Sequence, residues 1–164
     1  MANLYRLCIR VKQMTQEILH ILGGLPALLD LELRSEAADE PMEMLSFCNS
    51  QFRCIKIFRL YGPIMGLMFE DGAMPELEAL SIEIRACQVQ SALAGHPDLG
   101  IHHLTSLRDL NVWINCGGAT LQEVEVLEVA ISDAVNLLSS HPKLYFHRDN
   151  QEEMVKDDTI TPCN

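Results

Sequence analysis

The sequence contains few aromatic and few basic residues. Aromatic residues make up 5% of its 164 residues, and Trp113 is the single tryptophan. Twelve lysines and arginines stand against 23 aspartates and glutamates, which gives a formal net charge of −11. This balance disfavours long-range attraction to nucleic acid or to an anionic membrane surface. We therefore expect no nucleic-acid partner.

The sequence also lacks a long hydrophobic run. No apolar stretch reaches the roughly 18–20 residues that a membrane-spanning helix needs. Among the first twenty residues, the charged side chains of Arg6, Arg10, Lys12 and Glu17 interrupt any signal-peptide core. These absences predict a protein with no membrane span, which is not secreted and lies in the cytoplasm.

The cysteines form no recognisable framework. Six are present, at positions 8, 48, 54, 87, 116 and 163, with no C-x-x-C pair and no zinc-type spacing. In a cytoplasmic protein they are expected to be reduced thiols. Cys54, Cys87 and Cys116 lie in or beside apolar segments, where a free cysteine often packs as a small hydrophobic residue.

Motifs of catalysis and cofactor binding are absent as well. The sequence has no G-x-x-x-x-G-K-[ST], no G-x-G-x-x-G and no G-x-S-x-G. Gly117 and Gly118 precede a helical segment, but a loop glycine pair in that place is more typical of a turn than of an anion site. His102 and His103 have no acidic or cysteine ligand at a diagnostic spacing. We expect no enzyme activity, no metal site and no cofactor in this chain.

What the sequence does contain is a repeated apolar pattern. In LPALLDLEL (25–33), apolar residues stand at Leu25, Leu28, Leu31 and Leu33. The same spacing recurs in units that begin at residues 1, 52, 74 and 104. A period in the twenties with an L-x-x-L-x-x-L-x-L core is typical of leucine-rich repeats. The final L-x-L is a short strand with alternate residues in the core, and neighbouring repeats must stack because none can bury its apolar face alone.

The predicted fold is an α/β repeat, a leucine-rich repeat solenoid over residues 1–148. Short parallel strands line its concave face, the convex side is irregular or helical, and a C-terminal helix caps it. Strands are predicted near 6–11, 30–34, 57–61, 79–85, 109–115 and, at the end, 144–147. Helices are predicted at 15–24, after an N-cap at Thr15, and at 120–139, after a Thr120–Glu123 capping box. Residues 36–51 are expected to be irregular, 62–73 to form a loop, and 149–164 to form an acidic disordered tail.

The residues that flank the inward L-x-L positions should point out of the concave face. This face is the usual recognition surface of such repeats. Tryptophan, tyrosine and arginine are also enriched at binding hot spots. Two alternatives to a binding function are that this face is an ordinary solvated surface of a sheet, and that the end of the repeat array covers Trp113. The predicted partner-binding residues are Arg6, Arg10, Asp30, Glu32, Arg34, Arg59, Tyr61, Glu83, Arg85, Asp109, Asn111 and Trp113.

The order of the sequence blocks resembles a known family. The blocks are LGGLPALLDLEL (22–33), FRCIKIFRL (52–60), FEDGAMPELEALSIEI (69–84), GIHHLTSLRDLNVWINCGGAT (100–120) and EVEVLEVAISDAVNLLSSHPKL (123–144). In this order they resemble the C-terminal leucine-rich repeat region of cereal-type plant disease resistance proteins with coiled-coil, nucleotide-binding and leucine-rich repeat domains. The resemblance implies recognition of a pathogen effector or of a host target, and contact with the receptor's own nucleotide-binding domain.

The chain also departs from that family. The coiled-coil and nucleotide-binding domains are missing, so the resemblance implies a truncated product that binds no nucleotide by the family's motif. Its first strand would be an uncapped edge that exposes Leu4, Leu7 and Ile9, which predicts marginal stability or self-association. Two alternatives stay open from the sequence: a leucine-rich adapter of the ubiquitin-ligase type, and a pseudogene product without function.

Overall fold

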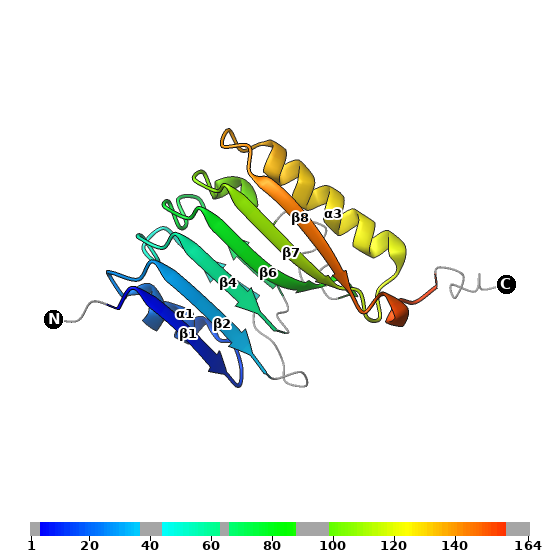
Figure 1. Cartoon of the computed structure of the whole chain (residues 1–164), viewed down its shortest axis with the longest axis horizontal. Coiled ribbons are helices and arrows are strands. Elements are labelled where there is room, and N and C mark those ends of the chain that lie inside the picture. Colours follow the sequence, from blue (N-terminus) through cyan, green and yellow to red (C-terminus); the bar gives the residue numbers. More distant parts are fainter. Residues whose placement is uncertain (1–3, 37–43, 63–65, 88–98, 157–164) are drawn as a thin grey trace.

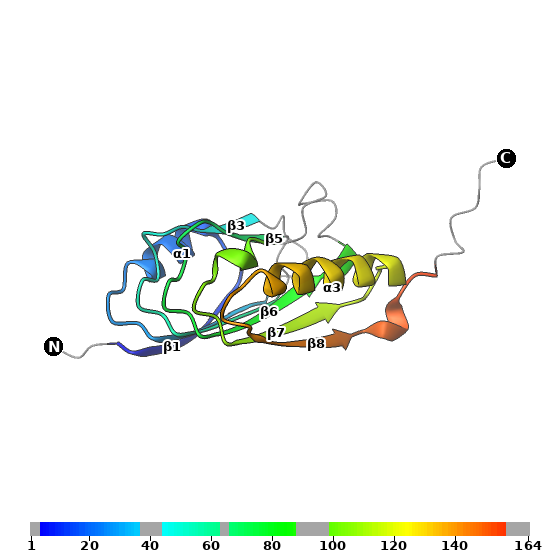
Figure 2. The same ribbon diagram turned by 90° about the horizontal axis from the view of Figure 1, so that it is seen from above.

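A computed structural model of the chain describes residues 4–36, 44–62, 66–87 and 99–156. Its main feature is a parallel sheet of six strands in the order β1-β2-β4-β6-β7-β8 (Figure 1). In the described residues, helices α1 (Gln16–Gly23) and α3 (Leu121–Asn136) and a second, two-stranded sheet lie on one side of this sheet. Figure 2, seen from above, shows the other side without any of these elements. The core lies between the layers.

The six strands form at the predicted L-x-L positions. They are β1 (Arg6–Val11), β2 (Asp30–Ser35), β4 (Ile57–Tyr61), β6 (Ala79–Arg85), β7 (Asp109–Asn115) and β8 (Lys143–Asp149). Their register is in phase, so that Leu31, Phe58, Leu80 and Leu110 form one row across the sheet. All four side chains are 0% exposed. Successive side chains of a strand point to opposite faces of the sheet, so this row lies in the core and the intervening residues lie on the opposite face.

Both predicted helices are present, and both begin at the expected caps. The Thr15 hydroxyl accepts a hydrogen bond from the Ile18 amide at the start of α1. At the start of α3, the Glu123 amide donates to the Thr120 hydroxyl at 3.1 Å, and the Thr120 amide donates to the Glu123 carboxylate at 2.8 Å. This capping box satisfies two amides that the first helical turn would otherwise leave unpaired.

Thr120→Ala should lower the free energy of unfolding by about 1 kcal/mol, because the Glu123 amide loses its acceptor. Urea denaturation of the purified chain measures this. Glu125→Ala, an exposed position on the same helix, is the control and should change the free energy by less than about 0.5 kcal/mol. Equal effects of the two substitutions would contradict a stabilising cap.

The predictions for residues 36–51 and 62–73 were wrong in part. Each stretch contains a short strand, β3 (Met44–Phe47) and β5 (Gly66–Phe69), and the two pair in parallel. Leu45, Phe47, Leu67 and Phe69 are buried and form part of the core. The glycine-rich, acidic composition favoured loops, but pairing between segments distant in sequence and burial of their apolar residues outweigh local propensity.

The predicted disordered tail was wrong for residues 149–156. β8 continues to Asp149, and a 3-10 turn, η2 (Gln151–Glu153), follows it. The Gly118 amide donates to the Glu153 carbonyl at 3.0 Å, and the Val155 amide donates to the Ala119 carbonyl at 2.9 Å. Met154 packs against the core. These contacts hold an acidic segment in place. Residues 157–164, with Asp157, Asp158 and Cys163, lie outside the described residues, as do residues 1–3.

Candidate functional site

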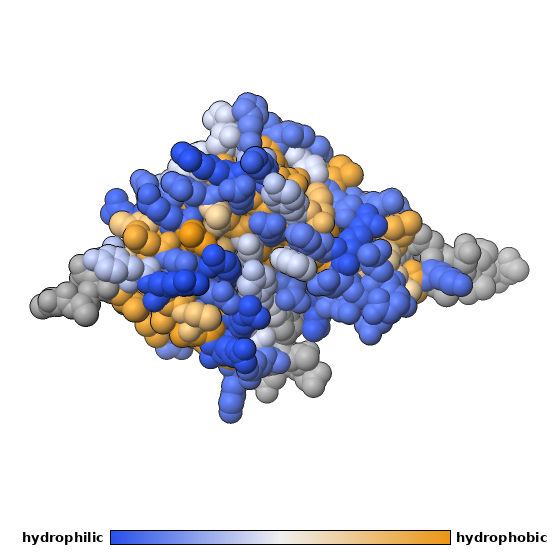
Figure 3. Space-filling model, in the orientation of Figure 1, coloured by the Kyte–Doolittle hydropathy of each residue, from blue (hydrophilic) through white to orange (hydrophobic). Residues whose placement is uncertain are grey.

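The side of the six-stranded sheet that faces away from the helices carries the predicted site. We call it the open face, defined by the outward residues of β1, β2, β4, β6, β7 and β8. All twelve predicted partner-binding residues stand at outward positions, and each is half-buried or exposed. The strands bring together residues from Arg6 to Trp113. Figure 3 shows this face, with mostly hydrophilic surface over its middle and hydrophobic surface at the β1 end.

Ion pairs cross the first three strands of the open face. Arg59 donates to Asp30 at 2.7 Å, and Arg6 lies 3.4 Å from the other oxygen of the same carboxylate. One acidic side chain on β2 thus holds arginines from both neighbouring strands. Surface pairs of this kind add at most about 1 kcal/mol of stability each. Their main effect is to orient the guanidinium groups.

Arg34 makes two contacts that place it on the same face. It donates to Glu32 at 2.7 Å, and its guanidinium carbon lies 5.0 Å from the centre of the Tyr61 ring. The hydrogen bond from Arg34 lowers the pKa of Glu32, despite the opposing effect of desolvation. The result is a cation-π pair whose arginine is also fixed by a carboxylate.

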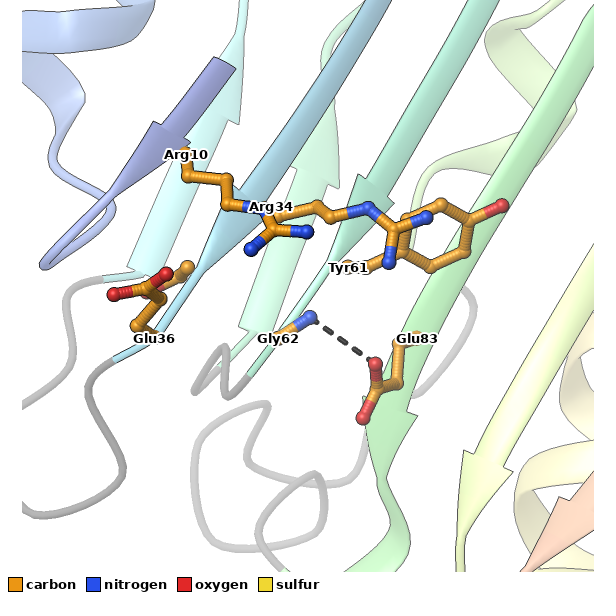
Figure 4. A pocket seen from close by; sticks show the side chains of 7 residues that line it. Arg10, Arg34, Glu36, Tyr61, Gly62 and Glu83 are labelled. Atoms are coloured by element: carbon orange, nitrogen blue, oxygen red, sulfur yellow. Dashed lines mark hydrogen bonds between the residues drawn. The ribbon is translucent and has the colours of Figure 1, made fainter. Parts of the chain in front are cut away.

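A hollow of about 240 Å³ lies beside this pair, at the ends of the strands. Figure 4 shows Arg10, Arg34 and Tyr61 around it, with Glu36 and Glu83 on either side of Gly62. Glu83 accepts a hydrogen bond from the Gly62 amide at 3.1 Å. The hollow therefore offers two guanidinium groups, two carboxylates and an aromatic ring, which suits contact with a polar protein surface.

The second aromatic pair of the open face involves a residue that sequence reasoning missed. The rings of Trp113 and His147 are stacked, with centroids 4.1 Å apart and planes 16° from parallel. His147 is on β8, directly opposite Trp113 in the register, and Tyr145 on the same strand is 47% exposed. In the sequence, the apolar residues Leu144 and Phe146 stand at alternate positions. This pattern could have assigned Tyr145 and His147 to the open face. Trp113 is half-buried, so β8 covers it only in part.

Other candidate positions have structural explanations. The Gly117 amide donates to the Asn115 side chain, and the Gly118 amide donates to a carbonyl of the C-terminal segment, so these amides belong to a turn. His103 lies 3.6 Å from Asp71. Within the described ranges, no three histidine, cysteine, aspartate or glutamate side chains come together in a way that could hold a metal ion.

Five cysteines lie in the described part of the chain, and they are free thiols. Cys116 is buried, as expected, and burial raises the pKa of its thiol. Cys54 is exposed, which contradicts its predicted packing: its side chain falls outside the apolar spacing of Phe52, Ile55 and Phe58. None of the helices in the described ranges has the length and apolar character that crossing a membrane would require.

The parallel sheet has one face of mixed charge with two aromatic pairs, over which the structure places no other described helix or strand. The family model described as "Leucine-rich repeat region" matches residues 1–144, so the chain belongs to this family. Leucine-rich repeat regions are generally non-enzymatic modules that bind proteins. No solved structure matches the chain.

Proposed function

We propose that this chain is the protein-recognition module formed by the terminal leucine-rich repeats of a plant innate immune receptor. The class is the cereal-type disease resistance protein with coiled-coil, nucleotide-binding and leucine-rich repeat domains. The sequence blocks from LGGLPALLDLEL (22–33) to EVEVLEVAISDAVNLLSSHPKL (123–144) support this class. The match to a leucine-rich repeat family over residues 1–144 is consistent with it.

In this proposal, the strands are successive turns of a solenoid and the open face is its concave recognition surface. The chain acts in the cytoplasm, is not an enzyme and needs no cofactor of its own. Its partners are a pathogen effector, a host target of that effector, or the receptor's own nucleotide-binding domain. Contact with that domain would hold the receptor inactive until a ligand shifts the balance.

The observation that carries the proposal is the chemistry of the open face. It presents two aromatic pairs, Arg34 with Tyr61 and Trp113 with His147, beside arginines held by ion pairs. Tryptophan, tyrosine and arginine are the residues most enriched at binding hot spots. Side chains that are already ordered in the free protein also lose less entropy on binding.

The test measures binding of the purified chain to the nucleotide-binding part of a cereal receptor of this class. We expect binding by the unaltered chain and a loss of at least about thirtyfold in affinity for Tyr61→Ala/Trp113→Ala, because the loss of even one hot-spot aromatic residue costs roughly 2 kcal/mol. Biolayer interferometry gives the dissociation constants, and circular dichroism checks that the variant is folded.

The matched control is Leu137→Ala. Leu137 is 76% exposed and lies at the end of α3, behind the sheet, so its substitution should leave affinity unchanged. Equal losses for both variants, or no loss for the double variant, would contradict recognition through the open face. If the nucleotide-binding part does not bind at all, the proposed inhibitory contact is wrong. Co-purification of ubiquitin-ligase scaffold subunits from plant extract would favour the adapter function instead.

A further inference from the structure

Helix α3 carries apolar side chains on the side that faces away from the core. Val126 is 40% exposed, Val129 is 59% exposed, and Leu137, which follows the last residue of the helix, is 76% exposed. Together with the exposed Asp133, they are separated by steps of three, four and four residues, which places them on one line along a helix. We call these four residues the α3 stripe. The outer side of a solvated helix is normally polar, so the stripe indicates a surface that contacts a partner.

The neighbours of α3 in the array leave this stripe uncovered. The helix contacts η1 (Ile101–His103) and β8, beside which it runs in Figure 1. Glu128 marks the side that faces β8, because its carboxylate accepts hydrogen bonds of 2.8 and 2.7 Å from Arg148 on that strand. Since successive residues of a helix turn by about 100°, the α3 stripe lies roughly 100–180° around the helix from Glu128. A further repeat stacked beyond β8 would therefore meet the Glu128 side and not the stripe.

The charge around the stripe indicates what kind of partner it accepts. The helix contains no lysine or arginine, and its acidic residues are Glu123, Glu125, Glu128 and Asp133. Asp133 lies inside the stripe, and neither it nor Glu125 forms an ion pair with the described residues. A purely apolar partner would bury the Asp133 carboxylate without a counter-charge, which is costly. The complementary surface therefore combines apolar side chains with lysine or arginine.

A second copy of the chain does not provide that complement. Two α3 helices side by side would bring their acidic residues together, and each chain has a net charge of −11. We propose that the α3 stripe binds an amphipathic helix of another protein, with apolar residues over Val126, Val129 and Leu137 and a lysine or arginine beside Asp133. Helices pack in pairs through such stripes, and this one is about 17 Å long, which matches about three turns of a partner helix.

The experiment uses the purified chain and a fluorescent, alanine-based peptide of about 20 residues, which is long enough to form a helix in water. Leucines at helical spacing form the apolar side of the peptide, and lysines flank them. Fluorescence anisotropy should show saturable binding. A matched peptide with glutamate in place of lysine should bind at least about tenfold more weakly, because its charges repel those of α3.

Leu137→Ser/Asp133→Lys tests whether the peptide binds at the stripe. This variant should bind the lysine peptide at least about tenfold more weakly, because it removes an apolar contact and reverses the charge beside it. It should also reduce the advantage of the lysine peptide over the glutamate peptide. Both positions are exposed, so the variant should fold normally, which circular dichroism checks.

The matched control makes the same changes on α1. Ile21 is 63% exposed and Glu17 is also exposed, so Ile21→Ser/Glu17→Lys removes a similar apolar side chain and gives the same net charge. Because salt screens charges that are far from the bound peptide, its affinity for the lysine peptide should stay within about twofold of that of the unaltered chain.

Four results would overturn the inference. They are no saturable binding of the lysine peptide, equal binding of the two peptides, equal losses for the α3 and α1 variants, and self-association in light scattering that Leu137→Ser/Asp133→Lys abolishes. Equal losses would mean attraction to the overall acidic charge, and self-association of that kind would make a second copy the occupant.

The α3 stripe is a second surface, separate from the open face. Tyr61→Ala/Trp113→Ala should leave binding of the lysine peptide unchanged, and Leu137→Ser/Asp133→Lys should leave binding of the nucleotide-binding part unchanged. Failure of one proposal is therefore distinguishable from failure of the other.

Discussion

Replacing Phe47 by alanine should lower the free energy of unfolding by about 3–5 kcal/mol, a large part of the roughly 5–15 kcal/mol that stabilises a typical domain. Phe47 is 0% exposed on β3. Its ring stacks on Phe69 of β5 with centroids 5.0 Å apart, and meets Phe58 of β4 edge-on at 5.5 Å. The side chain therefore joins the small sheet to the large one, and its loss leaves a cavity between the two layers.

Urea denaturation followed by circular dichroism measures this loss. The control is Ile21→Ala, since Ile21 is 63% exposed on α1, and its free energy of unfolding should stay within about 0.5 kcal/mol of the unaltered chain. A cost below about 1.5 kcal/mol for Phe47→Ala would mean that the small sheet is not packed on the core as described.

Gly100→Ala should destabilise the chain by about 2–5 kcal/mol, the sum of backbone strain and steric overlap. Gly100 has φ of +70°, a left-handed conformation that favours glycine, and an added Cβ atom would overlap the carbonyl oxygen of Phe69. The neighbouring Leu99 carbonyl accepts the Phe69 amide at 2.9 Å. The overlap would push the turn before β7 away from β5 and break this contact.

Gly118→Ala separates the cost of backbone strain from the cost of steric overlap. Gly118 has nearly the same backbone angle, with φ of +74°, but an added Cβ atom would have nothing within 4 Å. It should therefore cost only the strain of about 1–2 kcal/mol. The difference between the two variants in thermal and urea denaturation measures the overlap at Phe69. Equal costs would contradict a close approach of these two segments.

The candidate site could be predicted in large part because its pattern is local. In DLNVWIN (109–115), Leu110, Val112 and Ile114 are apolar at alternate positions, and this pattern indicates both the strand and the face that holds Trp113. What could not be predicted is which outward residues meet. Arg34 lies over Tyr61 and Trp113 stacks on His147 because of the register between strands, and each contact joins residues that are distant in sequence.

By itself, the sequence determined the six strands of the large sheet, the face that each side chain occupies, and the caps of both helices. These features follow from alternation and cap patterns within a few residues, so no distant partner is needed to read them. Only the tertiary structure decided that 44–47 pairs with 66–69 and that 150–156 lies against the turn at 117–119. Each of these depends on backbone hydrogen bonds between distant segments, and local composition hardly predicts such pairing.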